Sequence, residues 1–253
     1  RAATFSSGFN ATAYLQPGKN QLELAVAPSG VYDDDFTYRA GDTCQVTLYG
    51  AFSDGTKKEM SNLTVTVEDD QPTIKDSTTY PAKYQTPLVN VDGSVRGYLT
   101  EFARPIHIKT IPRWRWVDAT PFDKNNPKHM KMLYRAYTHL LTLLQKRDFE
   151  GLKMAWSLAG REQAKAEAYM TEPEEFFDVM DIPGDFERAD DAAVVPRREW
   201  HEYTVKSYMG GKLVKLEDQR GHSPLRISSQ ESGWINSFLP LFSIIDGRMV
   251  ITR

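Results

Sequence analysis

The chain alternates between apolar and polar positions with a period of two over most of residues 1–75. The runs FNATAYL, NQLELAVAP, TCQVTLYGAF and SNLTVTVED carry this pattern, and PGKN and SDGT supply turn residues between such runs. Because successive side chains of a strand point to opposite faces, the alternation predicts short strands with one buried face. We therefore expect residues 1–75 to form an all-β, sandwich-like domain.

Two sequence segments of this domain resemble those of a known class of module. LQPGKNQLELAV and VTLYGAFSDGTKKE resemble lines found in immunoglobulin-like or jelly-roll accessory modules of exported bacterial proteins. The resemblance covers less than a third of the chain, and it implies a fold class without naming an activity.

Residues 76–125 are rich in proline, threonine and tyrosine. Helix is excluded over most of this stretch, because prolines recur through it, at Pro81, Pro87, Pro105, Pro112 and Pro121. We expect an extended linker that packs between two domains. The run DGSVRGYLTEF combines a turn signal with a following strand, so part of the linker is expected to pair with a sheet of either domain.

Helical periodicity begins after DKNNP, where Asn126 is a capping residue and Pro127 suits the first turn. A broad apolar stripe then recurs at helical spacing, formed by Met130, Leu133, Tyr134, Tyr137, Leu140, Leu141 and Leu144. A break near residues 148–151 separates this helix from a second one, and EPEEFFDVM begins a shorter third helix. We place the helices within residues 127–180.

The period changes back to two in residues 200–253. The runs EWHEYTVKSYM, KLVKLEDQ, PLRISSQ, FLPLFSII and RMVITR predict an antiparallel meander. Helices followed by a meander make residues 126–253 an α+β domain, and α+β is the expected class of the whole chain. The order of elements resembles the cone-shaped helix-plus-curved-sheet folds of the nuclear-transport-factor-two type.

Composition narrows the partners and the compartment. The net charge of −3 and the pI near 6.0 give no overall attraction to nucleic acid, so we expect none as a partner. No apolar run reaches the length of a membrane span. Cys44 is the single cysteine, expected to be a small buried residue. The chain begins at Arg1 with a hydroxyl-rich segment, which favours a periplasmic or otherwise exported protein over the cytoplasmic alternative.

A search for catalytic motifs finds no nucleophile elbow, zinc-protease helix, phosphate loop or dinucleotide fingerprint. We therefore expect no catalytic residues, no resident metal and no cofactor, although scattered residues could still assemble a site. His222 is the best histidine candidate, because carboxylates lie within a few positions on an expected hairpin loop. Together with His201 and Tyr203 it forms an alternative ligand site. Three carboxylates at Asp33–Asp35 favour a solvated loop, with weak calcium binding as the alternative.

Charge is distributed unevenly along the chain. Residues 104–131 contain seven cationic and two acidic side chains, whereas residues 161–191 contain eleven acidic and three cationic ones. An acidic surface of that density suits a basic partner, because complementary potentials raise association rates and penalise wrong partners. A solvated helix face and pairing with the basic stretch are the other interpretations. The expected contact residues here are Asp178, Asp181, Asp185, Asp190 and Asp191.

The stretch PRWRW at 112–116 places two tryptophans and two arginines in alternation. If the segment is extended, Trp114 and Trp116 project from one face and the arginines from the other. The indoles then either pack as a wedge between the domains or, with Arg115, form a platform for a sugar, a nucleobase or a protein. A protein interface fits the uneven charge best.

These features favour a non-enzymatic exported bacterial protein that binds a protein partner, such as a basic effector or enzyme, and neutralises or scaffolds it. The combination of architecture and charge resembles exported effector-immunity proteins, and this resemblance implies a toxin-neutralising inhibitor. A small-molecule-binding or hydrolytic cone-shaped domain is the first alternative. A carbohydrate-binding or structural component of the cell envelope is the second. The sequence alone leaves the oligomeric state open.

Overall fold

A computed structural model describes residues 8–30, 35–52, 54–76, 87–89, 98–167, 172 and 174–253. It confirms the α+β class, since helices and several antiparallel sheets occur together. The chain divides into two compact units. The β unit is residues Leu15–Pro112, and the helical unit combines Arg1–Tyr14 with Arg113–Arg253. Asp33 and Asp34 of the acidic loop considered for calcium lie outside the described residues.

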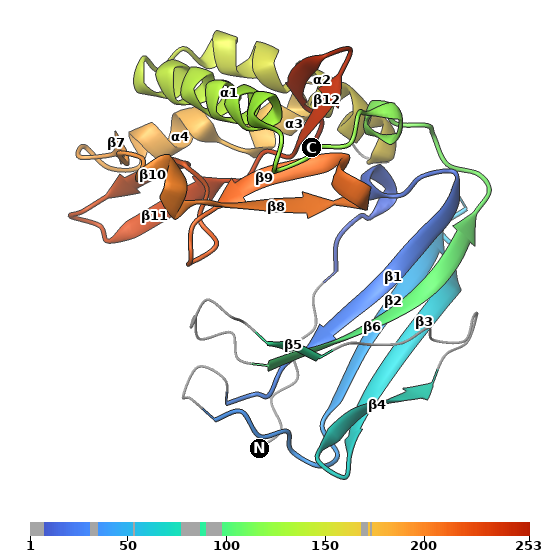
Figure 1. Cartoon of the computed structure of the whole chain (residues 1–253). Helices are drawn as coiled ribbons and strands as arrows, with labels where there is room; N and C mark the ends of the chain where they lie inside the picture. The colour runs from blue at the N-terminus through green and yellow to red at the C-terminus, as the bar shows by residue number, and fades with distance from the viewer. Residues whose placement is uncertain are drawn as a thin grey trace. The chain divides into compact units, whose positions relative to one another are not determined.

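The described residues of the β unit form two three-stranded antiparallel sheets (Figure 1). In one sheet β1 (Gly18–Val26), β6 (Tyr98–Ile108) and β5 (Pro87–Val89) lie in the order β1-β6-β5. In the other, the order is β2-β3-β4, formed by β2 (Thr43–Ala51), β3 (Lys57–Glu68) and β4 (Gln71–Asp76). The predicted alternation appears directly in β1, whose residues change between more and less exposed at every step.

Both sheets of the β unit contribute to one apolar core, which contains Val26, Leu63, Val65 and Phe102. The predicted sandwich-like arrangement is therefore present. Its boundaries differ from the expected residues 1–75, because β6 completes a sheet with β1 and lies in the stretch interpreted as a linker. The pairing of β6 depends on a partner more than 70 residues earlier, which local pattern does not reveal. Cys44 is exposed on β2, so the expectation of a buried cysteine was wrong.

Four α-helices are described in the helical unit. They are α1 (Pro127–Gln145), α2 (Phe149–Ala166), α3 (Glu175–Val179) and α4 (Ile182–Glu187). The side chain of Asn126 accepts a hydrogen bond from the Lys128 amide at 3.0 Å, as the capping signal predicts. Asp148 caps α2 in the same way, accepting from the Gly151 amide at 2.9 Å. The described residues also form short 3-10 helices, which are η1 (Thr12–Tyr14), η3 (Arg115–Asp118), η4 (Trp200–Glu202) and η5 (Met209–Gly211).

The strands after the helices are antiparallel, as expected, but they form two sheets in place of one meander. One sheet has the order β13-β12-β9-β8, from β8 (Thr204–Tyr208), β9 (Leu213–Glu217), β12 (Phe242–Ile245) and β13 (Arg248–Ile251). The other has the order β11-β10-β7, from β7 (Ala193–Val194), β10 (Leu225–Ser229) and β11 (Trp234–Phe238). The β10–β11 hairpin thus leaves the first sheet and pairs with β7, a strand too short for its sequence to predict.

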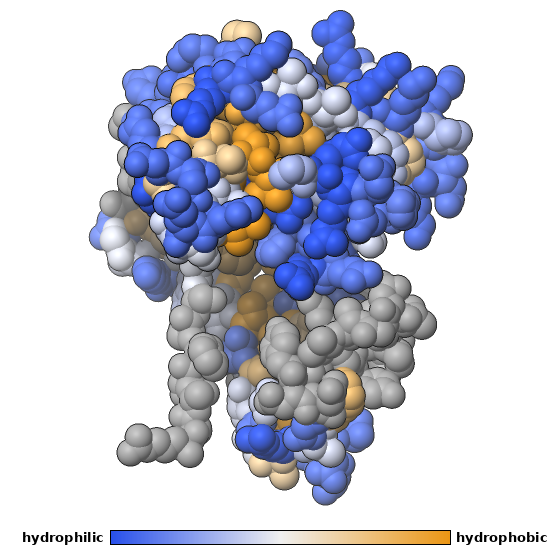
Figure 2. Space-filling view, turned by 90° about the vertical axis from the view of Figure 1, so that its left-hand side faces the viewer, coloured by the Kyte–Doolittle hydropathy of each residue, from blue (hydrophilic) through white to orange (hydrophobic). Residues whose placement is uncertain are grey.

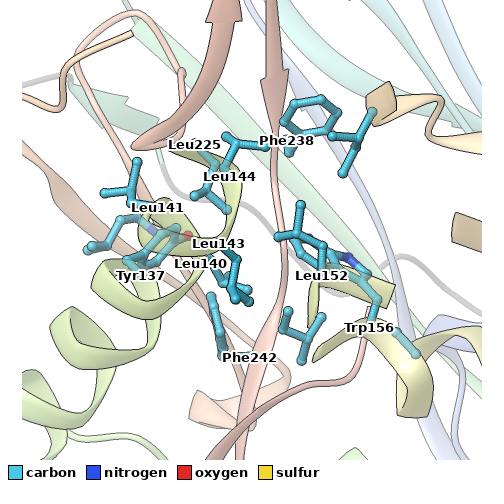
Figure 3. Packing of buried hydrophobic residues seen from close by; sticks show 14 of the residues in the cluster. Tyr137, Leu140, Leu141, Leu143, Leu144, Leu152, Trp156, Leu225, Phe238 and Phe242 are labelled. Carbon is cyan, nitrogen blue, oxygen red and sulfur yellow. The ribbon is translucent and has the colours of Figure 1, made fainter. Parts of the chain in front are cut away.

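The main core of the helical unit lies between the helices and the strands (Figures 1 and 3). Tyr137 of α1 is fully buried and lies 5.0 Å from Phe242 between ring centroids. Its hydroxyl oxygen accepts a hydrogen bond from the Leu216 amide at 3.0 Å, and burial raises the pKa of the phenol. Leu140 and Leu144 occupy the same stripe and are also buried. Five members of the predicted stripe are therefore buried on the core-facing side of α1, whereas Met130 and Tyr134 are partly buried at its edge.

The first described residues of the chain belong to the helical unit rather than to the sandwich. FNATAYL is not a strand; its residues Thr12–Tyr14 form η1, and Ala13 is fully buried. The Asn10 side chain donates hydrogen bonds to the Ala166 carbonyl at 2.9 Å and to Glu167 Oε2 at 2.8 Å. These contacts fasten the segment to the end of α2. Hydrogen bonds to residues far away in the sequence therefore outweigh the local alternating pattern in this segment.

Candidate protein-binding surface

The strongest concentration of negative charge lies on α3, α4 and their flanks, residues 174–190, which we call the acidic segment. It contains seven carboxylates against a single cation, Arg188. Apolar side chains hold it in place. Phe177 is buried and packs edge-on against Trp156 of α2 at 6.5 Å between centroids. Ile182 and Phe186 are buried in the same core, so α3 and α4 each contribute an apolar contact beneath their charged surface.

Asp178 and Asp181 project from this segment into solvent, with side chains 65% and 64% exposed. Each forms one long, solvent-exposed ion pair, since Lys153 Nζ is 3.7 Å from Asp178 and Arg188 is 4.0 Å from Asp181. Asp181 has a φ of +48°, a left-handed conformation that Asp tolerates better than most residues. Both carboxylates are therefore largely exposed to solvent, and their contact with a partner stays a prediction.

Val179 stands between these two carboxylates in the sequence and is 70% exposed. Exposed large apolar residues of the helical unit also include Met154, Ile235 and Leu239. Figure 2 shows an apolar area on the surface of this unit, enclosed by hydrophilic residues. An exposed apolar side chain next to carboxylates, as Val179 is beside Asp178, is an arrangement found at protein interfaces.

Asp185 is not part of the accessible surface, although the sequence predicts it to be. Its side chain is 1% exposed, and it accepts a hydrogen bond from Asn236 Nδ2 at 2.5 Å and pairs with Arg188 at 3.0 Å. A carboxylate this deeply buried needs such partners to offset its lost hydration. Asp185 therefore joins α4 to β11 and is unavailable to a partner.

Asp190 and Asp191 have different surroundings. Asp190 is exposed in the turn after α4. Asp191 holds the β10–β11 turn, because its carboxylate accepts hydrogen bonds from Ser229 Oγ at 2.5 Å and from the amides of Gln230 and Glu231 at 2.8 and 3.0 Å. The Ser229 hydroxyl and then these amides lower the pKa of Asp191. Of this pair, Asp190 remains a candidate contact and Asp191 has a structural role.

The two indoles of PRWRW are inside the helical unit. Trp114 and Trp116 are 1% and 0% exposed and pack with Ala13, Val117, Ala166 and Leu213. Their Nε1 atoms donate to the carbonyls of Thr12 and Ala13, both at 3.0 Å. The expectation of an extended platform was wrong, because residues 115–118 form η3 and the indoles bury a large apolar area while their N–H groups are satisfied.

A buried ion pair lies beside these indoles. Arg253 Nη1 is 2.6 Å from Glu162 Oε2, and their side chains are 1% and 9% exposed. The other Glu162 oxygen accepts from the Arg115 amide at 2.7 Å. Burial lowers the pKa of Arg253, and the Glu162 carboxylate opposes that effect. Only the backbone of Arg115 is engaged here; its side chain is 57% exposed and lies 3.1 Å from Asp246, so it stays accessible as predicted.

The fold brings together two of the three residues of the alternative ligand site, Tyr203 and His222. Tyr203 is buried, and its hydroxyl accepts from the Arg198 amide at 3.0 Å. Arg198 Nε is also 3.5 Å from Asp218 Oδ2, and His222 Nδ1 is 3.8 Å from that same oxygen. Tyr203 and His222 thus belong to one polar cluster centred on Asp218, a buried residue that the sequence offered only as a neighbour of His222.

His201 has no demonstrated place in this cluster. It lies on η4 and is exposed, whereas Tyr203 at the end of the same turn is buried. No group of three or more histidine, cysteine, aspartate or glutamate residues suited to a metal occurs in the described part of the chain. Among the described helices, none has the length and apolar character to cross a membrane.

One surface was missed by the sequence interpretation. A groove of about 540 Å³ runs along α1, with Lys124, Lys131 and Arg135 around an apolar floor of Met130 and Tyr134. The basic excess of residues 104–131 pointed towards it, but Arg135 lies beyond that stretch.

Comparison of the chain with protein-family models, with curated proteins and with solved structures gives no match.

Proposed function

We propose that this chain is a non-enzymatic binding protein that uses the acidic segment to contact a basic protein partner. The observation that supports this most is Val179, an exposed apolar side chain between the exposed carboxylates of Asp178 and Asp181. Carboxylates steer a cationic partner during approach, and the apolar residue then gains from being removed from water. The proposed role is that of an exported immunity or inhibitor protein, which neutralises or scaffolds its partner.

The geometry of the segment suits recognition by a rigid surface. Phe177, Ile182 and Phe186 fix α3 and α4 to the core, and buried Asp185 ties α4 to β11. Binding therefore costs little ordering of the backbone, which is a general source of affinity.

The alternatives have unequal support. The polar cluster around Asp218, with Tyr203 and His222, is the one observation that favours a small-molecule site. The space between the helices and strands is filled by apolar side chains, so a cone-shaped cavity has no support from the residues in Figure 3. A carbohydrate platform at Trp114 and Trp116 lacks exposed rings.

The test is affinity capture from a lysate of the source organism with the tagged chain, at low and moderate salt. The test variant is Asp178→Lys with Glu187→Lys, since both residues are exposed and helical. We expect the wild type to retain a stoichiometric basic protein that is lost as salt rises, because screening shortens the reach of surface charge. The variant should retain much less of it.

The matched control is Asp42→Lys with Glu59→Lys, which makes the same change in net charge on exposed residues of the β unit. Far-UV circular dichroism checks that both variants remain folded. Equal capture by the wild type and the acidic-segment variant would overturn the proposal. Equal loss in both variants would show a general charge effect and would also contradict a specific surface.

A further inference from the structure

The groove along α1 has a chemical character opposite to that of the acidic segment. Three cationic side chains, Lys124, Lys131 and Arg135, line it, and no carboxylate is among its described lining residues. Met130 and Tyr134 form the apolar part of its floor. Such a groove fits an acidic surface that presents an apolar side chain.

Helical spacing builds this groove. Pro127, Met130, Lys131, Tyr134 and Arg135 recur at three- and four-residue intervals, which places them along one side of α1. The core-facing stripe of Leu133, Tyr137 and Leu140 occupies the neighbouring side and is buried. Met130 and Tyr134 lie at the edge of this buried stripe and are partly buried, so α1 is held by its core contacts while the groove side stays partly exposed.

The apolar floor of the groove is itself fixed. The ring of Tyr134 stacks on Trp200, with centroids 4.8 Å apart and an interplanar angle of 18°. The guanidinium of Arg197 lies over the Trp200 ring, with its Cζ 4.3 Å from the ring centroid. These ring contacts limit the motion of Tyr134, which favours a groove whose shape changes little when it is occupied.

The chain itself carries a surface that matches this groove. Val179 is 70% exposed, and the carboxylates of Asp178 and Asp181 flank it and are accessible. Each feature has a counterpart: an apolar side chain for the floor at Met130 and Tyr134, and two carboxylates for the cations at Lys131 and Arg135. We infer that the acidic segment of a second copy of this chain occupies the α1 groove.

This contact is heterologous, because different surfaces of the two copies meet. The dimer then still offers one free groove on one copy and one free acidic segment on the other, so association continues head to tail with concentration. The inference goes beyond the proposed function, since it concerns a copy of the chain rather than an external basic partner. It also implies that self-association and that partner compete for the acidic segment.

Sedimentation velocity over a range of protein concentrations tests the inference. At about 20 mM salt we expect the weight-average sedimentation coefficient to rise with concentration, and at about 500 mM salt we expect the rise to be largely lost. The groove variant is Lys131→Gln with Arg135→Gln, and the segment variant is Asp178→Asn with Asp181→Asn. Each should raise the dissociation constant about tenfold, as expected for removing two surface charge pairs.

Mixing the two variants gives the sharpest result. The groove variant keeps an intact acidic segment and the segment variant keeps an intact groove, so an equimolar mixture should form heterodimers that do not extend further. Lys57→Gln with Lys58→Gln is the control, because it removes two exposed cations from the β unit. We expect this control to associate like the wild type.

Three results would overturn the inference. They are a wild-type chain that stays monomeric at low salt, association weakened equally by the β-unit control, and a mixture of the two variants that associates no better than either alone. The groove variant also separates this inference from the proposed function, because it retains the acidic segment. Capture of a basic partner by the groove variant would leave the proposed function standing even where self-association fails.

Discussion

Asp178 and Asp185 lie seven residues apart on the acidic segment and have opposite surroundings. Asp178 is 65% exposed, whereas Asp185 is buried between Asn236 and Arg188. An exposed ion pair contributes up to about 1 kcal/mol to stability, while a buried charge left without its partner costs several times more. Residues of one type on one segment therefore divide into those free to bind a partner and those required by the fold.

Glu162 belongs to the second group, and its removal should be costly. Glu162→Ala leaves the Arg253 guanidinium buried without its carboxylate and removes the acceptor of the Arg115 amide. We expect a loss of about 3–5 kcal/mol in the free energy of unfolding, measured by urea titration with tryptophan fluorescence. Glu150→Ala, an exposed change on the same helix, should cost less than about 0.5 kcal/mol. Similar costs for the two variants would contradict this role of Glu162.

At the scale of elements, local signals decide where helices begin and long-range contacts decide what the strands pair with. Asn126 and Asp148 cap α1 and α2 through hydrogen bonds to amides two and three residues later. These are short-range interactions that a sequence pattern reports directly. The run DGSVRGYLTEF predicts the strand that begins β6, but the partner of β6 and the β7–β10 pairing lie far along the chain and needed the structure.

The α1 cap provides a prediction at this scale. Asn126→Ala removes the acceptor of the Lys128 amide and should lower the free energy of unfolding by about 1 kcal/mol. Asn125→Ala is the natural comparison, because it is an adjacent exposed asparagine whose side chain is not the cap. Urea denaturation of both variants gives the difference. An equal effect of the two changes would mean that the cap contributes nothing measurable to α1.

At the scale of the whole molecule, the helical unit is built from two parts of the sequence separated by the β unit. Residues 8–14 supply Ala13 and the backbone carbonyls that receive the Trp114 and Trp116 N–H groups. The Ala13 carbonyl also accepts from Arg253 Nε at 2.7 Å. The start of the chain thus completes a core that otherwise consists of residues beyond 112.

Ala13→Asp tests this discontinuous construction. All five tryptophans lie in the helical unit, so their fluorescence follows that unit alone. A carboxylate in place of the buried Ala13 should lower the free energy of unfolding of the helical unit by more than about 3 kcal/mol, since it is desolvated among apolar side chains.

Ala193→Asp in the same unit is the control, because Ala193 is exposed and its replacement should change the unfolding curve little. A fluorescence-detected transition that is the same for Ala13→Asp and wild type would show that residues 8–14 do not support the helical unit.

The sequence by itself determined the properties that depend on neighbouring residues. It determined the α+β class, the period of the strands, the start of α1, its core-facing stripe and the acidic character of residues 174–190. These follow from side-chain alternation, capping and charge, which act over a few positions.

The tertiary structure decided which residues of each pattern face solvent and which distant segments pair. In the folded chain Trp114, Trp116 and Asp185 are buried, and Asp191 accepts hydrogen bonds within the β10–β11 turn. Residues 8–14 belong to the helical unit, and Arg135 lines the groove along α1. The reason is energetic: large apolar surfaces are buried, and the enclosed polar groups are hydrogen-bonded, through partners 39 to 103 residues away in the sequence. Local sequence patterns contain no record of those partners.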